Sequence, residues 1–260
     1  MSQNPSKSQL LPALRFCSGL LLGAACAWGM PSLAFGADNS QATLLVGVQS
    51  GFRPALEQLL PTLTQKTGMQ FQILDSNSSE LYKRIESGHS GLDLIIANND
   101  GSLNVYEDRK LIEKGSIVPI VSSQVVLWCP SEKVTMRVSI LDTLMNAPEI
   151  TLGIPGPLTP SMRGVKDILD KLPKSIKIIN AKNHLESWRL AYRQQVDCAV
   201  TMKSMMGSSN GLNFRNFPKN LVQITAVTPV DSKHPDKARE ISQLLISPMM
   251  RGRLHNAGFQ

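Results

Sequence analysis

The chain has 260 residues and a formal net charge of +7 at pH 7, with 42% hydrophobic and 5% aromatic residues. Its Lys and Arg residues are dispersed and its aromatic residues are scarce, so we expect no nucleic-acid partner. The sequence lacks the local spacings of a nucleophile elbow, a phosphate loop, a zinc protease and a paired-cysteine zinc site. We therefore expect no enzyme, no cofactor and no metal centre.

Residues 1–36 have the features of a secretory signal peptide. Lys7 and Arg15 precede an apolar run over 20–28, which a short stretch containing small residues follows. This order predicts cleavage before Ala37 and a periplasmic protein. The loss of two basic residues from 27 leaves 25, against 20 acidic residues, a net charge of +5.

Two alternatives stay open for this segment. The apolar run is too short for a convincing membrane span, but an uncleaved anchor is compatible with it. Cys26 could be acylated, although Gly23 stands where a lipid-attachment box would have Leu. We favour cleavage and a soluble extracytoplasmic protein.

Eight strand-like runs alternate with helical patterns through the rest of the chain, which predicts an α/β fold with largely parallel sheets. The runs cover residues 44–48, 69–74, 93–97, 124–129, 150–154, 176–179, 196–201 and 221–227. Pro61 should end or kink the helix after the first run near Leu60. A helix over 233–247 and a helical segment ending at Gly258 close the chain.

Serines open helices at three of the predicted strand-to-helix junctions. Ser50 and Gly51 follow the first strand, Asn77 and Ser78 follow the second, and Ser161 follows the fifth. Hydroxyls and unpaired backbone N–H groups at the positive end of a helix hold small anions. In open α/β sheets, ligands bind beyond the carboxyl ends of the strands. These junctions therefore predict a binding cleft for a small oxyanion.

Four stretches resemble one family. Residues 78–88 read Ser-Ser-Glu-Leu-Tyr-Lys-Arg-Ile-Glu-Ser-Gly, and 92–98 read Leu-Asp-Leu-Ile-Ile-Ala-Asn. Weaker matches are Val-Val-Leu-Trp-Cys-Pro at 125–130 and the closing helix over 245–259. The first two are similar to the Ser-Ser-x-x-Leu, Ile-x-x-Gly and Ala-Asp-Leu-Phe-Ile-Ser-Ala pattern of periplasmic molybdate-binding proteins, the substrate-binding components of ABC importers.

The resemblance implies the type II periplasmic-binding-protein fold, in which two lobes each have a mostly parallel sheet flanked by helices. Lobe 1 would comprise 37–122 with 226–260, and lobe 2 would comprise 123–225. The lobes would be joined by crossovers at 121–125 and 222–226. The implied function is capture of molybdate or tungstate by a monomer and delivery to a membrane permease.

The resemblance also implies the ligand contacts. Ser50 or Gly51 would make the first, Ser78 the second and Ser161 the third, with Asn77 as a secondary candidate. Thr-Pro-Ser-Met replaces the family's Val-Pro-Ala-Gly around the third contact, which keeps the proline and changes the side chains.

Further contacts are less regular. Arg163 could add a charged contact, or it could be a solvated arginine. His184 stands near the family's fourth contact, with a surface-loop histidine as the alternative. Met202 replaces a family tyrosine, and an oxygen left unpaired by the lost hydroxyl costs about 1–3 kcal/mol. We expect this methionine, with Met205 and Met206, to pack in the core rather than to bind a soft metal.

Two questions stay open. Cys129 and Cys198 lie in apolar runs, where a disulfide and two buried free thiols are both compatible with an oxidising compartment. The altered cleft also suits a diverged binding protein for another anion or small solute, acting as the ligand sensor of a membrane receptor.

Overall fold

The computed structural model describes residues 42–99, 101–147, 149–156, 162–206 and 213–260. The expected signal peptide, including Cys26, and the third expected contact, Ser161, lie outside these ranges. Within them, no helix is long and apolar enough to cross a membrane.

The described ranges contain the eight strands that the hydrophobic runs predict, with small differences at most ends. They are β1 (Thr43–Gln49), β2 (Gln70–Ser76), β3 (Leu94–Asn98), β4 (Val118–Trp128), β5 (Thr151–Pro155), β6 (Lys177–Ala181), β7 (Cys198–Met202) and β8 (Phe214–Val227). The helices are α1 (Arg53–Thr67), α2 (Ser78–Glu86), α3 (Leu103–Asp108), α4 (Ile140–Met145), α5 (Arg163–Leu169), α6 (His184–Tyr192), α7 (Pro235–Leu245) and α8 (Pro248–Asn256). A short 3₁₀ helix, η2 (Lys203–Met205), follows β7.

The strands form a single sheet in the order β2-β1-β3-β8-β4-β7-β5-β6. Strand β1 pairs in parallel with β2 and β3, and β5 pairs in parallel with β6 and β7. The long strands β4 and β8 pair with each other and with their outer neighbours in antiparallel fashion. Two parallel groups are therefore joined through an antiparallel centre.

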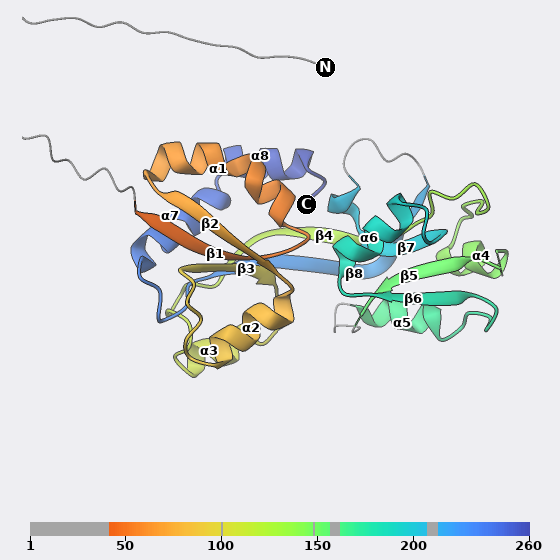
Figure 1. Ribbon diagram of the computed structural model, residues 1–260, viewed down its shortest axis with the longest axis horizontal. Helices are drawn as coiled ribbons and strands as arrows, with labels where there is room; N and C mark the ends of the chain where they lie inside the picture. The colour runs from red at the N-terminus through yellow and green to blue at the C-terminus, as the bar shows by residue number, and fades with distance from the viewer. Residues whose placement is uncertain (1–41, 100, 148, 157–161, 207–212) are drawn as a thin grey trace, which may run out of the picture. The chain divides into compact units, whose positions relative to one another are not determined.

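Helices cover both faces of the sheet. Figure 1 shows α1 and α8 on one side of β1–β3, with α2 and α3 on the other side. Around β5–β7, Figure 1 shows α6 and α5 on opposite sides. Covering both faces suits parallel strands, whose near-continuous apolar runs are buried on both faces.

The hydrophobic core changes along the two long strands. In β4, Val121 belongs to a cluster around β1, whereas Val125 belongs to a cluster around β5 and β7. In β8, Ile224 belongs to the first of these clusters and Val222 to the second. Each parallel group thus has its own core, and the lobe limits given above stay a prediction.

Helix α1 does not end near Leu60. It contains Pro61 and continues to Thr67, and Gly68 follows with a φ of 70°. Leu59 and Leu63, on either side of the proline, are both buried in the core. This packing offsets the backbone hydrogen bond that a proline cannot donate.

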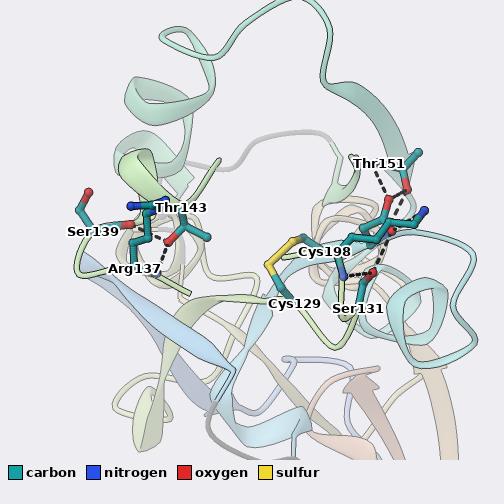
Figure 2. Close-up of a disulfide and its surroundings, with 9 residues drawn as sticks. Cys129, Ser131, Arg137, Ser139, Thr143, Thr151 and Cys198 are labelled. Carbon is teal, nitrogen blue, oxygen red and sulfur yellow. Dashed lines mark hydrogen bonds and ion pairs between the residues drawn. A yellow bond between two sulfur atoms is a disulfide. The ribbon is translucent and has the colours of Figure 1, made fainter. Parts of the chain in front are cut away.

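A disulfide joins Cys129 to Cys198, so the two buried thiols that the sequence left open as an alternative are not free (Figure 2). The bond links the end of β4 to the start of β7, where the antiparallel register places Trp128 opposite Ala199. Both sulfur-bearing residues are fully buried.

Candidate functional site

A cavity of about 280 Å³ collects most of the expected contact residues. Ser50, Gly51, Asn77, Ser78 and His184 all line it. They come from the junctions between β1 and α1, between β2 and α2, and between β6 and α6. The cavity thus lies at the carboxyl ends of parallel strands from both groups, as the rule for open α/β sheets leads one to expect.

The start of α2 offers several donors to the cavity. The Asn77 side-chain oxygen accepts a hydrogen bond from the Glu80 N–H at 2.9 Å. The N–H groups of Ser78 and Ser79 precede the first intrahelical hydrogen bond and so have no acceptor in the helix. The Ser78 hydroxyl oxygen accepts from the Asn98 N–H at 3.1 Å, which leaves the hydroxyl proton for a ligand.

Ser50 and Gly51 have different environments. Both the N–H and the hydroxyl of Ser50 donate to the Ser76 carbonyl, at 3.0 and 3.3 Å. A Cβ at Gly51 would lie 2.3 Å from the Met205 Cε and 2.5 Å from the Met202 Cε, so only glycine fits without rearrangement. Both donors of Ser50 are thus engaged within the protein, and the choice between Ser50 and Gly51 for the first contact stays a prediction.

The start of α6 repeats the arrangement of α2. The Asn183 side-chain oxygen accepts from the Glu186 N–H at 2.9 Å, and the N–H groups of His184 and Leu185 have no acceptor in the helix. His184 is therefore the first residue of a capped helix rather than a loop residue. Burial lowers the pKa of the His184 imidazole to about 4, so the side chain is neutral at pH 7.

Three residues that line the cavity each have a buried polar atom for which the described residues supply no hydrogen-bond partner. These atoms are Gln49 Nε2, Asn98 Oδ1 and His184 Nδ1. An unsatisfied buried polar atom costs about 1–3 kcal/mol, so such a cluster is expected where a ligand or a rearrangement completes the hydrogen bonds.

Several cavity residues were not predicted from the sequence. Gln49 and Asn98 are the last residues of β1 and β3. Their place at the carboxyl end of a strand is the one sequence signal that could have identified them. Lys83 and Lys182 are exposed cations that sequence patterns do not distinguish from solvated surface lysines. Glu80 adds an acid, and the Ser76 hydroxyl that donates to it holds the pKa of this carboxyl below its usual value.

One expected contact, Met202, lies elsewhere. Met202 is fully buried in the core around β5 and β7 and does not line the cavity, whereas Met162 and Met205 do. Arg163 is the first residue of α5. In the described ranges, no group of three His, Cys, Asp or Glu side chains could hold a metal ion.

Comparisons with known proteins identify the fold. The periplasmic molybdate-binding protein of Azotobacter vinelandii superimposes with a TM-score of 0.71 at 17% identity, over 84% of this chain and 98% of that chain. The PBP AgtB from A. tumefaciens R10, in complex with agropinic acid, gives 0.67 at 12% identity, over 83% and 81%. The sulfate-binding protein SubI from Mycobacterium tuberculosis H37Rv gives 0.64 at 14% identity, over 84% and 86%.

These identities show a shared fold, the two-lobed α/β fold of periplasmic binding proteins, and leave the ligand undetermined. No curated protein sequence matches the chain. The family profile described as bacterial extracellular solute-binding protein matches residues 44–260. The chain therefore belongs to the family of bacterial extracellular solute-binding proteins.

Proposed function

We propose that this protein captures a small oxyanion, molybdate or tungstate in the first instance, in the 280 Å³ cavity and delivers it to an ABC permease in the membrane. The observation that carries the proposal is the convergence of the starts of α2 and α6 with the Gly51 loop on one cavity. The resemblance in residues 78–98 supports the choice of anion.

The donor set suits an anion that keeps its charge. Each helix start carries roughly half a positive charge and several N–H groups without an intrahelical acceptor. Such fixed dipoles replace the water that the anion loses, with no need for a buried counter-ion. Lys83 and Lys182 at the cavity add a long-range attraction that raises the association rate.

The location and the partner belong to the same proposal. Solute-binding proteins of this family act outside the cytoplasm, which agrees with the signal peptide expected over residues 1–36. The permease would recognise the liganded protein. We propose no catalytic role, because the cavity is built from donors that hold an anion and the family consists of binding proteins.

Calorimetric titration tests the proposal. The full chain is expressed with its own N-terminal segment, purified, freed of bound solute by unfolding and refolding, and titrated with molybdate, tungstate, sulfate and phosphate. We expect a dissociation constant in the micromolar range or below for molybdate and tungstate. This corresponds to a binding free energy of about −8 kcal/mol or more favourable. Binding of sulfate or phosphate alone would mean that this anion, and not molybdate or tungstate, is the ligand. No binding of any of the four would refute capture of inorganic oxyanions.

A further inference from the structure

The cavity is larger than an inorganic oxyanion requires. A water molecule takes about 30 Å³ in the liquid, so four oxygen atoms around a central atom need roughly 120 Å³. The cavity has about 280 Å³. If the proposed function holds, more than half of the space remains for another part of the ligand.

A second cavity of about 340 Å³ adjoins the first. The two cavities share four lining residues, which are Ser50, Lys182, Asn183 and Leu185. The second cavity continues along α6 and is also lined by Arg189 and Arg193. A ligand held at the start of α6 can therefore extend toward the end of this helix.

The second cavity is lined by cations whose charge no acidic side chain of the described residues pairs with. Among the described residues, Lys182, Arg189 and Arg193 form no ion pair, and all three are exposed. Its two acids are already engaged: Arg53 donates to Asp75 at 3.3 Å, and Glu186 accepts from the Lys182 backbone N–H. Two unpaired arginines suit a carboxylate, which a guanidinium binds through two parallel hydrogen bonds.

The spacing along α6 limits the ligand's length. Arg189 follows His184 by five residues, about 7.5 Å along the helix axis. Since an arginine side chain is long and flexible, a spacer of one to three carbon atoms suffices between the two anionic groups. We propose that this site also accepts a small organic acid with two anionic groups, a phosphate-type head at the starts of α2 and α6 and a carboxylate at Arg189 and Arg193.

A matched ligand series tests this inference on the full chain. Phosphonoacetate, 3-phosphonopropionate and 4-phosphonobutyrate carry both anionic groups, whereas propylphosphonate carries only the head. We expect at least one of the three acids to bind ten times more tightly than propylphosphonate in calorimetric titrations. The double variant Arg189→Gln/Arg193→Gln should abolish this preference and leave propylphosphonate affinity within twofold of wild type.

The control variant Arg109→Gln/Lys114→Gln removes the same charge from exposed residues that line neither cavity, and it should keep the preference. Equal affinity for the acids and propylphosphonate, or a preference that survives in Arg189→Gln/Arg193→Gln, would overturn the inference. If inorganic oxyanions or propylphosphonate still bound, the proposed function would stand. If no anion bound at all, both would fall.

Discussion

At the scale of single residues, Ser78 combines a structural and a ligand-binding role. Its hydroxyl oxygen accepts from the Asn98 N–H, and its hydroxyl proton is available to the cavity. Ser78→Ala removes this donor, so we expect oxyanion affinity to fall about tenfold, the lower end of the 1–3 kcal/mol cost of an unpaired group. Calorimetric titration with the tightest-binding anion measures the change.

Ser116→Ala is the matched control for this variant. The Ser116 hydroxyl also accepts from a backbone N–H, that of Thr228 at 3.3 Å, and it does not line the cavity. Both variants should lose a similar amount of unfolding free energy, whereas only Ser78→Ala should bind the anion more weakly. Equal affinity of the two variants would mean that the Ser78 hydroxyl does not contact the anion.

His184 gives the protein a stability that depends on pH. Burial lowers the pKa of this imidazole from 6.5 to about 4, so below pH 6.5 the unfolded chain takes up a proton that the folded chain does not. The neutral imidazole therefore contributes its full stability above pH 6.5, and this contribution is lost as pH falls toward 4. The loss reaches about 3 kcal/mol at most.

The variant His184→Gln isolates this contribution. Urea unfolding of wild type and variant at pH 7.0, 5.5 and 4.5 gives the free energy of unfolding of each, and the carboxylates titrate equally in both. We expect wild type to lose more stability than the variant over this range. Parallel pH profiles would mean that the folded protein exposes His184 to water.

At the scale of helices and strands, α2 and α6 begin with the same Asn-x-x-Glu pattern. Asn77 and Asn183 are the N-caps, and each is followed three residues later by a glutamate, Glu80 or Glu186, whose N–H donates to the cap. The capping box of helices uses this spacing. One device, repeated in both halves of the sheet, thus orients the N–H groups that face the cavity.

Cap removal should affect stability and binding together at these two helices. Asn77→Ala and Asn183→Ala should each lower the free energy of unfolding by about 1 kcal/mol and weaken anion binding, because a frayed first turn no longer orients its N–H groups. Ser139 caps α4 in the same way, at 2.9 Å from the Asp142 N–H, and lines neither cavity. Ser139→Ala should lower stability alone, and a loss of affinity in this variant would contradict the argument.

Hydrophobic runs predict all eight described strands, including β2 and β6, which lie at the two edges of the sheet and bury few residues. They miss the starts of β4 and β8, which contain Pro119 and Pro218. Proline usually excludes a central strand, but the β4–β8 register shifts between Pro119 and Val121 and so accommodates the first of them. Long-range pairing, which no local pattern encodes, overrides the local preference here.

The site could be predicted only in part, for a similar reason. Ser78 and Gly51 lie at strand-to-helix junctions, which the chain order reveals. The opposing wall depends on contacts between distant segments: Met205 rather than Met202 lines the cavity, and Arg189 becomes relevant only because α6 borders a second cavity. The sequence leaves a surface-loop histidine open as an alternative for His184, and the structure excludes it because Asn183 caps a helix that begins at His184.

At the scale of the whole molecule, the cavity takes contacts from both cores. Ser78 belongs to the helix packed beside β1 and β3, and His184 belongs to the helix packed beside β5 and β7. The buried side chains of the two cores form separate clusters. An anion that binds both helix starts therefore links the two cores. Strands β4 and β8 are the covalent connections between these cores.

The disulfide stabilises one of these cores and should leave the other unaffected. Cys129 and Cys198 are 69 residues apart, and closing a loop of this length stabilises a protein by about 4 kcal/mol through the entropy of the unfolded chain. Both cysteines lie in the cluster around β5 and β7.

We expect Cys129→Ala/Cys198→Ala to lower the free energy of unfolding in urea by about 2–5 kcal/mol. Neither cysteine lines the cavity, so the change should leave anion affinity within twofold. Unchanged stability in this variant would mean that the two thiols are not joined in the folded protein.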